Sequence, residues 1–282
     1  MSGFVVVLED GVEREGGVIP VALDSPLWTR GQSLFETVLV WPAGTWGLYR
    51  AVDHAGRLAR AAADLKWEGV PGVERMCEWM RLAARLFRAR HPGFGRLRLT
   101  VAWTRSEGPA STFVTVVPYE RPLGPVRAVT TPVRLPWAEG FTTPKSGSRA
   151  PYALAESLAA AAGCDEGLLL DAEGRPAEGA RSNLFALRGM ELRTPPVGSG
   201  ALPGITRARV LELAGEMGLR VREAPLDREW LSGADTLFLT NALWGVRPVA
   251  ELDGVALGDP HPWALRLRAA YEADVRAHLR EE

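Results

Sequence analysis

The chain of 282 residues is poor in lysine, asparagine, glutamine and cysteine. Two of its 33 basic residues are lysines, Lys66 and Lys145, and the others are arginines. Any chemistry that needs a side-chain amine therefore has two candidate residues. The scarcity of amide side chains fits either a GC-rich genome or the avoidance of heat-labile residues.

Charge, cysteine content and hydropathy exclude several classes of protein. The formal net charge of −1 gives no electrostatic basis for binding nucleic acid or an anionic membrane. The two cysteines form no CxxC pair, so neither a zinc site nor a disulfide framework is predicted, and a reducing cytoplasm is expected. No segment approaches the apolar run of about 18 residues that a membrane helix needs. The apolar run over 4–8 predicts a strand rather than a signal peptide. We therefore expect a cytoplasmic enzyme that acts on a small molecule.

Strand and helix patterns alternate along the chain and predict two α/β domains. The segment 119–125 (YERPLGP) carries two prolines and a glycine between apolar runs, which is typical of a linker. The sequence thus predicts an N-terminal α/β domain over 1–118, a linker over 119–125 and a C-terminal domain over 126–282. Lys145 lies in a loop of the C-terminal domain that is rich in glycine, serine and proline.

Several well-known motifs are missing. The glycines at 198, 200 and 204 have the wrong spacing for a dinucleotide fingerprint, and no Walker-type Gly-Lys-Ser/Thr run occurs. The four histidines show no metal-ligand spacing, and no serine lies in a GxSxG sequence. No metal site is predicted.

Lys145 is the stronger of the two amine candidates. Most lysines are solvated surface residues, and that alternative applies to both positions. Where arginine supplies positive charge throughout a chain, however, a retained lysine indicates an amine that must lose its proton. Lys66 follows a helix pattern next to Trp67, whereas Lys145 lies among small residues after a predicted strand.

Other polar residues stand where ligand groups are common. Glu178 follows a turn and precedes a strand, although a solvated carboxylate is its ordinary alternative. Ile205 and Thr206 begin a predicted helix, whose free N–H groups suit a phosphate as well as a simple threonine cap. Thr240 and Asn241 end an apolar strand, a frequent place for ligand contacts in α/β sheets.

The order of these motifs resembles that of the fold-type IV pyridoxal-phosphate enzymes, which include branched-chain and D-amino-acid aminotransferases and aminodeoxychorismate lyase. The resemblance implies a two-domain fold, with a smaller N-terminal α/β domain and a larger C-terminal domain built on a mixed, barrel-like sheet. It also implies a homodimer. The matching stretches are RGQSLFET (30–37), DHAGRL (53–58), the Lys145 loop, DEGLLLDAEGRPAEGARSNLF (165–185), LPGITRARV (202–210) and ADTLFLTNALWGVRPV (234–249).

The resemblance implies roles for individual residues around pyridoxal 5′-phosphate. Lys145 is similar to the lysine that forms the Schiff base, and Glu178 to the carboxylate at the pyridine nitrogen. A carboxylate there keeps the ring protonated, so that it can accept electrons. The resemblance also implies that Arg57 and the helix start at Ile205 and Thr206 bind the cofactor phosphate, that the Thr240 hydroxyl lies near it, and that Asn241 contacts the cofactor.

Within the family, three stretches favour aminodeoxychorismate lyase, which forms 4-aminobenzoate and pyruvate for folate biosynthesis. They are the Asn-Ala-Leu segment at 241–243, Arg149, and Arg105. Arg105 is expected to bind a substrate carboxylate, and a solvated arginine is its ordinary alternative. Thr37 matches a position near the reacting atoms in several members. The alternative is a branched-chain or D-amino-acid aminotransferase, and a non-catalytic relative is a third possibility. The chain departs from the family at Gln32 and Ser33, where the family has Asp-Gly.

Overall fold

The structure is a computed structural model, and its elements group into two compact units. The first unit comprises Met1–Arg121, Pro144–Ser148 and Val275–Glu282, and the second comprises Pro122–Thr143 and Arg149–Asp274. The structure describes residues 5–15, 24–43, 45–104, 110–122, 124–136, 142–259 and 261–281.

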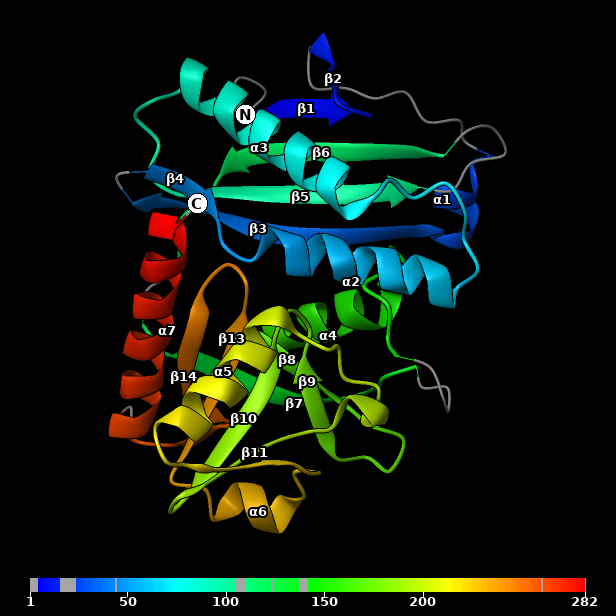
Figure 1. The fold of residues 1–282 in the computed structure, drawn as a ribbon. Coiled ribbons are helices and arrows are strands. Elements are labelled where there is room, and N and C mark those ends of the chain that lie inside the picture. Colours follow the sequence, from blue (N-terminus) through cyan, green and yellow to red (C-terminus); the bar gives the residue numbers. More distant parts are fainter. Residues whose placement is uncertain are drawn as a thin grey trace. The chain divides into compact units, whose positions relative to one another are not determined.

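The first unit is built on a six-stranded sheet in the order β2-β1-β6-β5-β3-β4, in which every neighbouring pair is antiparallel. Helices α2 and α3 lie along this sheet (Figure 1). The elements are β1 (Val6–Glu9), β2 (Val12–Glu13), α1 (Pro26–Arg30), β3 (Ser33–Ala43), β4 (Thr45–Leu48), α2 (Ala51–Asp64), α3 (Val73–Arg90), β5 (Leu97–Thr104) and β6 (Ser111–Pro118).

Buried and more exposed side chains alternate along the central strands, which explains why two helices cover one face of the sheet. In β5, Leu97, Leu99 and Val101 are fully buried while the residues between them are more exposed, which is the period of a strand with one covered face. Met76, Met80 and other apolar residues of α3 join the same core, together with residues of α2. This core fixes β3 and α2, which carry the polar cluster described below.

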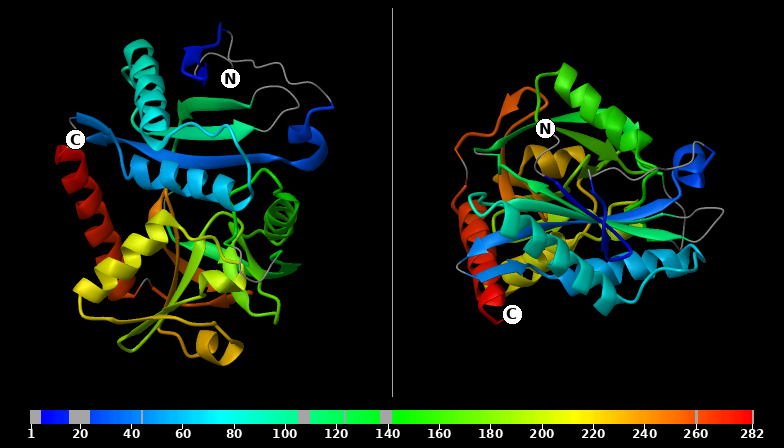
Figure 2. Two further views of the ribbon diagram at one scale, coloured as in Figure 1. Left: turned by 45° about the vertical axis from the view of Figure 1, so that its right-hand side comes forward. Right: turned by 90° about the horizontal axis from the view of Figure 1, so that it is seen from above.

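The second unit contains a nine-stranded mixed sheet, most of whose strands lie in the order β12-β11-β10-β13-β14-β7-β8-β9, with β15 pairing with β14. Helices α4 and α5 pack against this sheet, and α6 and most of α7 belong to the same unit (Figure 2). The elements are β7 (Val126–Arg134), α4 (Ala150–Ala161), β8 (Glu166–Leu170), β9 (Pro176–Gly179), β10 (Asn183–Arg188), β11 (Glu191–Thr194), the 3₁₀ turn η2 (Val197–Ser199), α5 (Ile205–Glu216), β12 (Arg220–Glu223), α6 (Arg228–Ser232), β13 (Thr236–Asn241), β14 (Gly245–Leu252), β15 (Val255–Ala256) and α7 (Pro262–Glu281).

An additional pairing between β9 and β10 closes part of this sheet into a six-stranded barrel. The closing contact is a single antiparallel pair, Asn183 with Glu178. The strands β14, β7 and β8 are parallel to one another, while β8–β9, β9–β10, β10–β13 and β13–β14 are antiparallel. The fold class expected from the sequence, two α/β parts with a mixed, barrel-like sheet in the second, is confirmed.

The compact units differ from the predicted boundaries at two places. Residues 144–148 and the end of α7 group with the first unit, although the sequence placed both in a domain over 126–282. The loop groups there because its backbone pairs with β3: the N–H of Phe35 donates to the carbonyl of Lys145 at 2.9 Å, and the N–H of Gly147 donates to that of Ser33 at 2.9 Å. The domain limits 1–118, 119–125 and 126–282 remain a prediction.

Helix α7 is the longest helix of the described chain and runs from the second unit into the first. Within the described residues, none of the helices combines the length and hydropathy that a membrane-spanning segment requires.

Candidate functional site

The Lys145 side chain lies on the face of β3 that carries Phe35 and Thr37. Its Nζ is 4.7 Å from the centre of the Phe35 ring. The register of β3 with β5 is continuous from Ser33 to Val40, so Phe35 and Thr37 point to the same side of the sheet. The structure therefore brings the predicted residues Lys145 and Thr37 to one face of one strand.

Two glycines allow the Lys145 loop to approach β3 closely. A Cβ at Gly147 would lie 2.2 Å from Ser33 Oγ, and a Cβ at Gly31 would lie 2.6 Å from Ser148 Oγ. Gly31 also has a φ of +59°, in the left-handed region that favours glycine. The departure at Gln32 and Ser33 thus falls in a segment that packs directly on the lysine loop.

A buried cluster of three ionisable side chains lies on the opposite, helix-covered face of β3. Glu36 is fully buried and accepts two hydrogen bonds from Arg57, from Nε to Oε1 and from Nη2 to Oε2, each 2.7 Å long. His54 Nδ1 lies 2.7 Å from Glu36 Oε2. Both partners project from α2 and are themselves buried.

Burial by itself would raise the pKa of Glu36, but the Arg57 charge and the hydrogen bonds from His54 and Arg57 outweigh it and lower that pKa to about 2. Glu36 is therefore ionised at neutral pH, and it fixes the guanidinium of Arg57 in a bidentate geometry. Arg57 was predicted as a phosphate ligand, and that role stays a prediction. The structure adds that Glu36 determines its orientation.

In the second unit, the carboxylate of Glu178 is buried and receives three hydrogen bonds from uncharged donors. The hydroxyl of Tyr152 donates to Oε1 at 3.2 Å. The side-chain amide of Asn183 donates to Oε2 at 3.2 Å, and the backbone N–H of Leu202 donates to the same oxygen at 2.8 Å. A carboxylate has about four acceptor sites, so this oxygen pair can accept a hydrogen bond from a cationic N–H in addition to these three.

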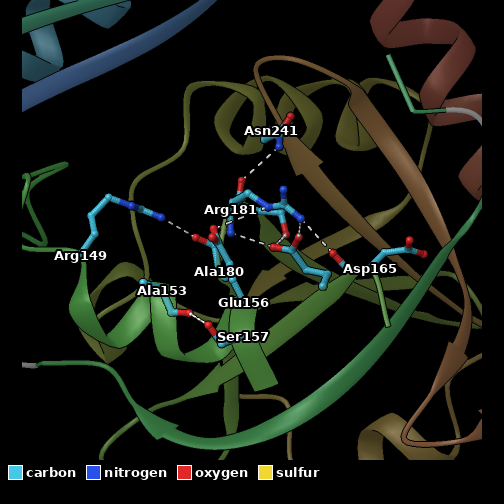
Figure 3. Close-up of polar contacts among 10 residues, drawn as sticks. Arg149, Ala153, Glu156, Ser157, Asp165, Ala180, Arg181 and Asn241 are labelled. Atoms are coloured by element: carbon cyan, nitrogen blue, oxygen red, sulfur yellow. Dashed lines mark hydrogen bonds and ion pairs between the residues drawn. The ribbon is translucent and has the colours of Figure 1, made fainter. Parts of the chain in front are cut away.

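Tyr152 comes from the first turn of α4, where Arg149 packs over its ring at 4.4 Å from the ring centre. Burial is the largest cause, and the negative charge of Glu178 the second, of a pKa of Tyr152 that lies far above its ordinary value. The phenol therefore keeps its proton and acts only as a donor to Glu178. Arg149 also donates a hydrogen bond to the Ala180 carbonyl at 2.7 Å (Figure 3).

Glu178, Asn183 and Thr240 form a row across three neighbouring strands. Asn183 of β10 pairs with Glu178 of β9 on one side and with Thr240 of β13 on the other, and both pairings are antiparallel. Directly paired residues of antiparallel strands point to the same face. The Thr240 hydroxyl is fully buried and has no hydrogen-bond partner among the described residues. A buried hydroxyl of this kind fits a ligand that supplies the missing partner.

The start of α5 has no side-chain cap. Its N-cap is Gly204, and the N–H groups of the first turn, which includes Ile205 and Thr206, are the ones that a helix cannot satisfy itself. The Thr206 hydroxyl lies 3.3 Å from the Tyr271 hydroxyl of α7, so this side chain has a partner within the protein. The predicted phosphate contact of Thr206 is therefore more readily made by its backbone N–H than by its hydroxyl.

Asn241 stabilises backbone turns on both sides of it. Its Oδ1 accepts hydrogen bonds from the N–H groups of Leu243 and Trp244, each 3.0 Å long, and its Nδ2 donates to the Arg181 carbonyl at 3.1 Å (Figure 3). Asn241 was predicted as a cofactor contact. Its amide joins the β13–β14 turn to the β9–β10 turn, and the cofactor contact stays a prediction.

The β9–β10 turn is also held by Glu166 of β8. This buried carboxylate accepts hydrogen bonds from the Arg181 N–H at 2.7 Å and from the Ser182 hydroxyl at 3.0 Å. Burial raises the pKa of Glu166, and the donors of Arg181 and Ser182 oppose that shift. The turn that follows Glu178 is thus fixed at several points.

Some members of these hydrogen-bond networks were predicted from the sequence as site residues, and others were not. Arg105, the predicted carboxylate ligand, lies outside the described residues. Glu36 carried a usable signal, since a charge inside an apolar strand requires a buried partner. The residues that were not predicted as site residues are Glu36, His54, Tyr152, Glu166 and Asn183.

Comparisons with known proteins point to one family. The chain is 41% identical over 111 residues to the branched-chain-amino-acid aminotransferase of Escherichia coli strain K12, a match that covers 39% of this chain and 36% of that protein. It is 39% identical over 153 residues to a putative branched-chain-amino-acid aminotransferase of Methanocaldococcus jannaschii, with 53% of each chain covered. The matched stretches thus span between a third and about half of these curated relatives.

Likeness to solved structures extends over nearly the whole chain. A T.th. branched-chain amino acid aminotransferase superimposes with a TM-score of 0.87 and 27% identity, covering 96% of this chain and 94% of that one. That structure is a complex with N-(5′-phosphopyridoxyl)-L-glutamate. Other structures of the same aminotransferase contain pyridoxamine 5′-phosphate or 4-methylvaleric acid.

These relatives agree with pyridoxal 5′-phosphate as the expected cofactor. They do not support the lyase expected from the Asn-Ala-Leu segment, and they agree better with the aminotransferase alternative. A physical reason lies in the contacts of two residues that favoured the lyase. Asn241 bonds to turn backbone, and Arg149 bonds to the Ala180 carbonyl and stacks on Tyr152.

The family model described as amino-transferase class IV matches residues 33–252, which is most of the chain and includes both polar clusters. The chain belongs to the class IV aminotransferase family.

Proposed function

We propose that this protein is a pyridoxal-phosphate-dependent aminotransferase that transfers the amino group of branched-chain L-amino acids to 2-oxoglutarate. The observation that carries the proposal is the row of Glu178, Asn183 and Thr240. It places a buried carboxylate with neutral donors beside a buried hydroxyl that lacks a partner among the described residues. Such a set suits a ligand that has a cationic ring N–H and phosphate oxygens.

The residues present fit this cofactor. Glu178 would accept the hydrogen bond of the protonated pyridine nitrogen, and Thr240 Oγ1 would gain a phosphate oxygen as its partner. The uncapped first turn of α5, from Ile205, offers backbone N–H groups and a positive partial charge to the same phosphate. In the first unit, Glu36 holds Arg57, whose phosphate contact is implied by the resemblance and remains a prediction.

When bound, pyridoxal phosphate supplies an electron-accepting ring conjugated with the substrate nitrogen. Lys145 is the amine that would take the proton from the substrate Cα and deliver it to the cofactor carbon bonded to the substrate nitrogen. Its Nζ lies 4.7 Å from the centre of the Phe35 ring, so this ring covers one side of the amine.

The choice of substrates rests on the ligands of the relatives. The T.th. enzyme has been captured with an L-glutamate adduct of the cofactor and with an aliphatic acid. We therefore propose the same pair of substrate types for this chain, an apolar amino acid and L-glutamate or its 2-oxo acid.

The test is to incubate the purified protein with pyridoxal phosphate, 2-oxoglutarate and L-leucine, L-isoleucine or L-valine, and to measure L-glutamate. A parallel reaction contains aminodeoxychorismate and is assayed for 4-aminobenzoate. We expect glutamate and no 4-aminobenzoate. The opposite pattern would contradict the proposal and restore the lyase.

Two variants control this assay. Lys145→Arg keeps the charge but removes the amine chemistry, so glutamate formation should fall by at least about a thousandfold. Lys66→Arg changes the only other lysine, an exposed residue after α2, and should leave the rate unchanged. Equal rates in the two variants would contradict the role proposed for Lys145.

We further propose that the protein is a homodimer. Helix α4 exposes Leu154 and Leu158, 53% and 36% of whose surfaces are accessible. Exposed apolar side chains one turn apart are typical of a surface that a second chain covers. Light scattering after size exclusion should give twice the mass of the chain, and a monomer at micromolar concentration would contradict this assembly.

A further inference from the structure

The side-chain amide of Asn183 joins two parts of the second unit that are distant in sequence. Both of its N–H groups are used: Nδ2 donates to Glu178 Oε2 at 3.2 Å and to the Leu202 carbonyl at 2.8 Å. The N–H of Leu202 in turn donates to the same Glu178 oxygen at 2.8 Å. Three groups therefore form a closed triangle of hydrogen bonds.

The triangle extends to the first turn of α5. Leu202 and Gly204 belong to the short loop that leads into this helix, and the Gly204 N–H donates to the Leu202 carbonyl at 2.8 Å. Asn183 Oδ1 fills the space beside Gly204 so closely that a Cβ there would lie 2.0 Å from it. The amide thus contacts the loop with both of its ends.

The pairing of β10 with β9 places Asn183 where the barrel closes. Asn183 is the β10 member of the single pair that connects β10 to β9, and it also pairs with Thr240. Its side chain is buried, so its hydrogen bonds do not compete with water. One amide thus contacts both the Glu178 carboxylate and the loop that leads into α5.

We propose that Asn183 is a positioning residue that couples the carboxylate at the ring nitrogen to the phosphate-binding helix start, so that one side chain sets both ends of the cofactor site. The inference rests on the proposed function, because it takes Glu178 and the start of α5 as the two ends. Asn183 acts through Glu178 and Leu202.

Two substitutions break the triangle in different ways. Asn183→Asp keeps the shape but puts an oxygen where the two N–H donors were, next to Glu178 Oε2 and the Leu202 carbonyl. Asn183→Ala removes the amide and adds no charge, which provides a second variant if the first does not fold. Thr194→Val is the matched control. It removes a buried hydroxyl that donates at 2.7 Å to the carbonyl of Leu184, the residue after Asn183 in β10, and this hydroxyl is not one of the groups of the triangle.

The experiment measures dissociation constants for three probes: pyridoxal phosphate, pyridoxal, and the analogue of pyridoxal phosphate with a carbon in place of the ring nitrogen. The wild-type protein should prefer pyridoxal phosphate to both other probes. In each Asn183 variant we expect both preferences to shrink by about tenfold, since each end loses a buried hydrogen bond. Thr194→Val should leave both preferences unchanged, because a general loss of stability lowers the affinity for all three probes by the same factor.

A second measurement needs no cofactor. Exchange of the Leu202 amide hydrogen in the ligand-free protein should become at least about tenfold faster in the Asn183 variants and not in Thr194→Val. Loss of only one preference, or of neither, in a folded Asn183 variant would overturn the coupling while the proposed function stands. Failure of the wild-type protein to bind pyridoxal phosphate would instead overturn both.

Discussion

The buried carboxylate of Glu36 offers a test in which structure gives both a sign and a magnitude. We consider the variant Glu36→Gln, which keeps the size of the side chain and removes its charge. The pKa of this group falls from 4.5 to about 2 in the folded protein. A shift of that size corresponds to about 3 kcal/mol of stability at neutral pH, at roughly 1.4 kcal/mol per pH unit.

The direction with pH follows from the lowered pKa. A group whose folded pKa is depressed stabilises the protein above its unfolded pKa, and the stabilisation is lost as the pH falls through the folded pKa. Glu36→Gln should therefore be about 3 kcal/mol less stable than the wild type at pH 7. The difference should shrink to about half at pH 3, where the wild-type carboxyl has lost part of its advantage.

The assay is urea unfolding at several pH values, read by pulsed hydrogen exchange of peptides over 33–43 and 51–64. These peptides cover β3 and α2, so the signal comes from the first unit, and it avoids assuming that the whole chain unfolds in one step. Glu13→Gln is the control in the same unit, because Glu13 pairs with Arg90 at the surface. Exposed pairs contribute little, so its midpoint should barely move. A Glu36→Gln variant as stable as the wild type at pH 7, or a difference independent of pH, would refute the reasoning.

Two further predictions concern the second unit. Tyr152→Phe removes the donor to Glu178 Oε1 but keeps the ring under Arg149, and it should weaken pyridoxal phosphate binding about fivefold to tenfold in equilibrium dialysis. Ser157→Ala, which loses a hydroxyl on the same helix that donates to the Ala153 carbonyl, should show no change, and equal effects would argue against the Tyr152 contact. Thr240→Val should weaken pyridoxal phosphate about tenfold and leave pyridoxal unaffected. A loss of affinity for both compounds would show that the hydroxyl does not serve the phosphate.

Local patterns predicted the two α/β parts of the fold and named candidate site residues whose roles remain predictions. Strand alternation in β5 and β6 and the apolar stripe of α3 follow from periodicity, and the rarity of lysine singled out Lys145. The pairing of the lysine loop with β3 could not be predicted, because it joins residues more than 100 positions apart through an isolated bridge between Leu34 and Ser146. Glycines 31 and 147 were visible in the sequence, but their reason is a close approach that appears only in three dimensions.

The role of a polar side chain proved harder to predict than its presence. Asn241 and Asn183 are the two asparagines of the chain, and the sequence favoured Asn241 because it ends a strand. The structure shows that Asn241 satisfies turn backbone, whereas Asn183 contacts Glu178. Which of them reaches the carboxylate depends on strand pairing, because Asn183 lies opposite Glu178 whereas Asn241 lies opposite Gly245 at the end of β13.

That dependence explains why the site and the barrel closure are inseparable in this protein. Shifting β10 by one residue would turn Asn183 to the other face, away from Glu178 and Thr240. The β9–β10 strands share one residue pair, the turn between them adds backbone hydrogen bonds between Gly179 and Ser182, and β10 also pairs with β13 from Asn183 to Leu187. Side chains add to this backbone register: Glu166 accepts hydrogen bonds from Arg181 and Ser182 in the turn, and Asn183 donates to Glu178 across the pair. The interactions that close the barrel are thus the same ones that aim the carboxylate.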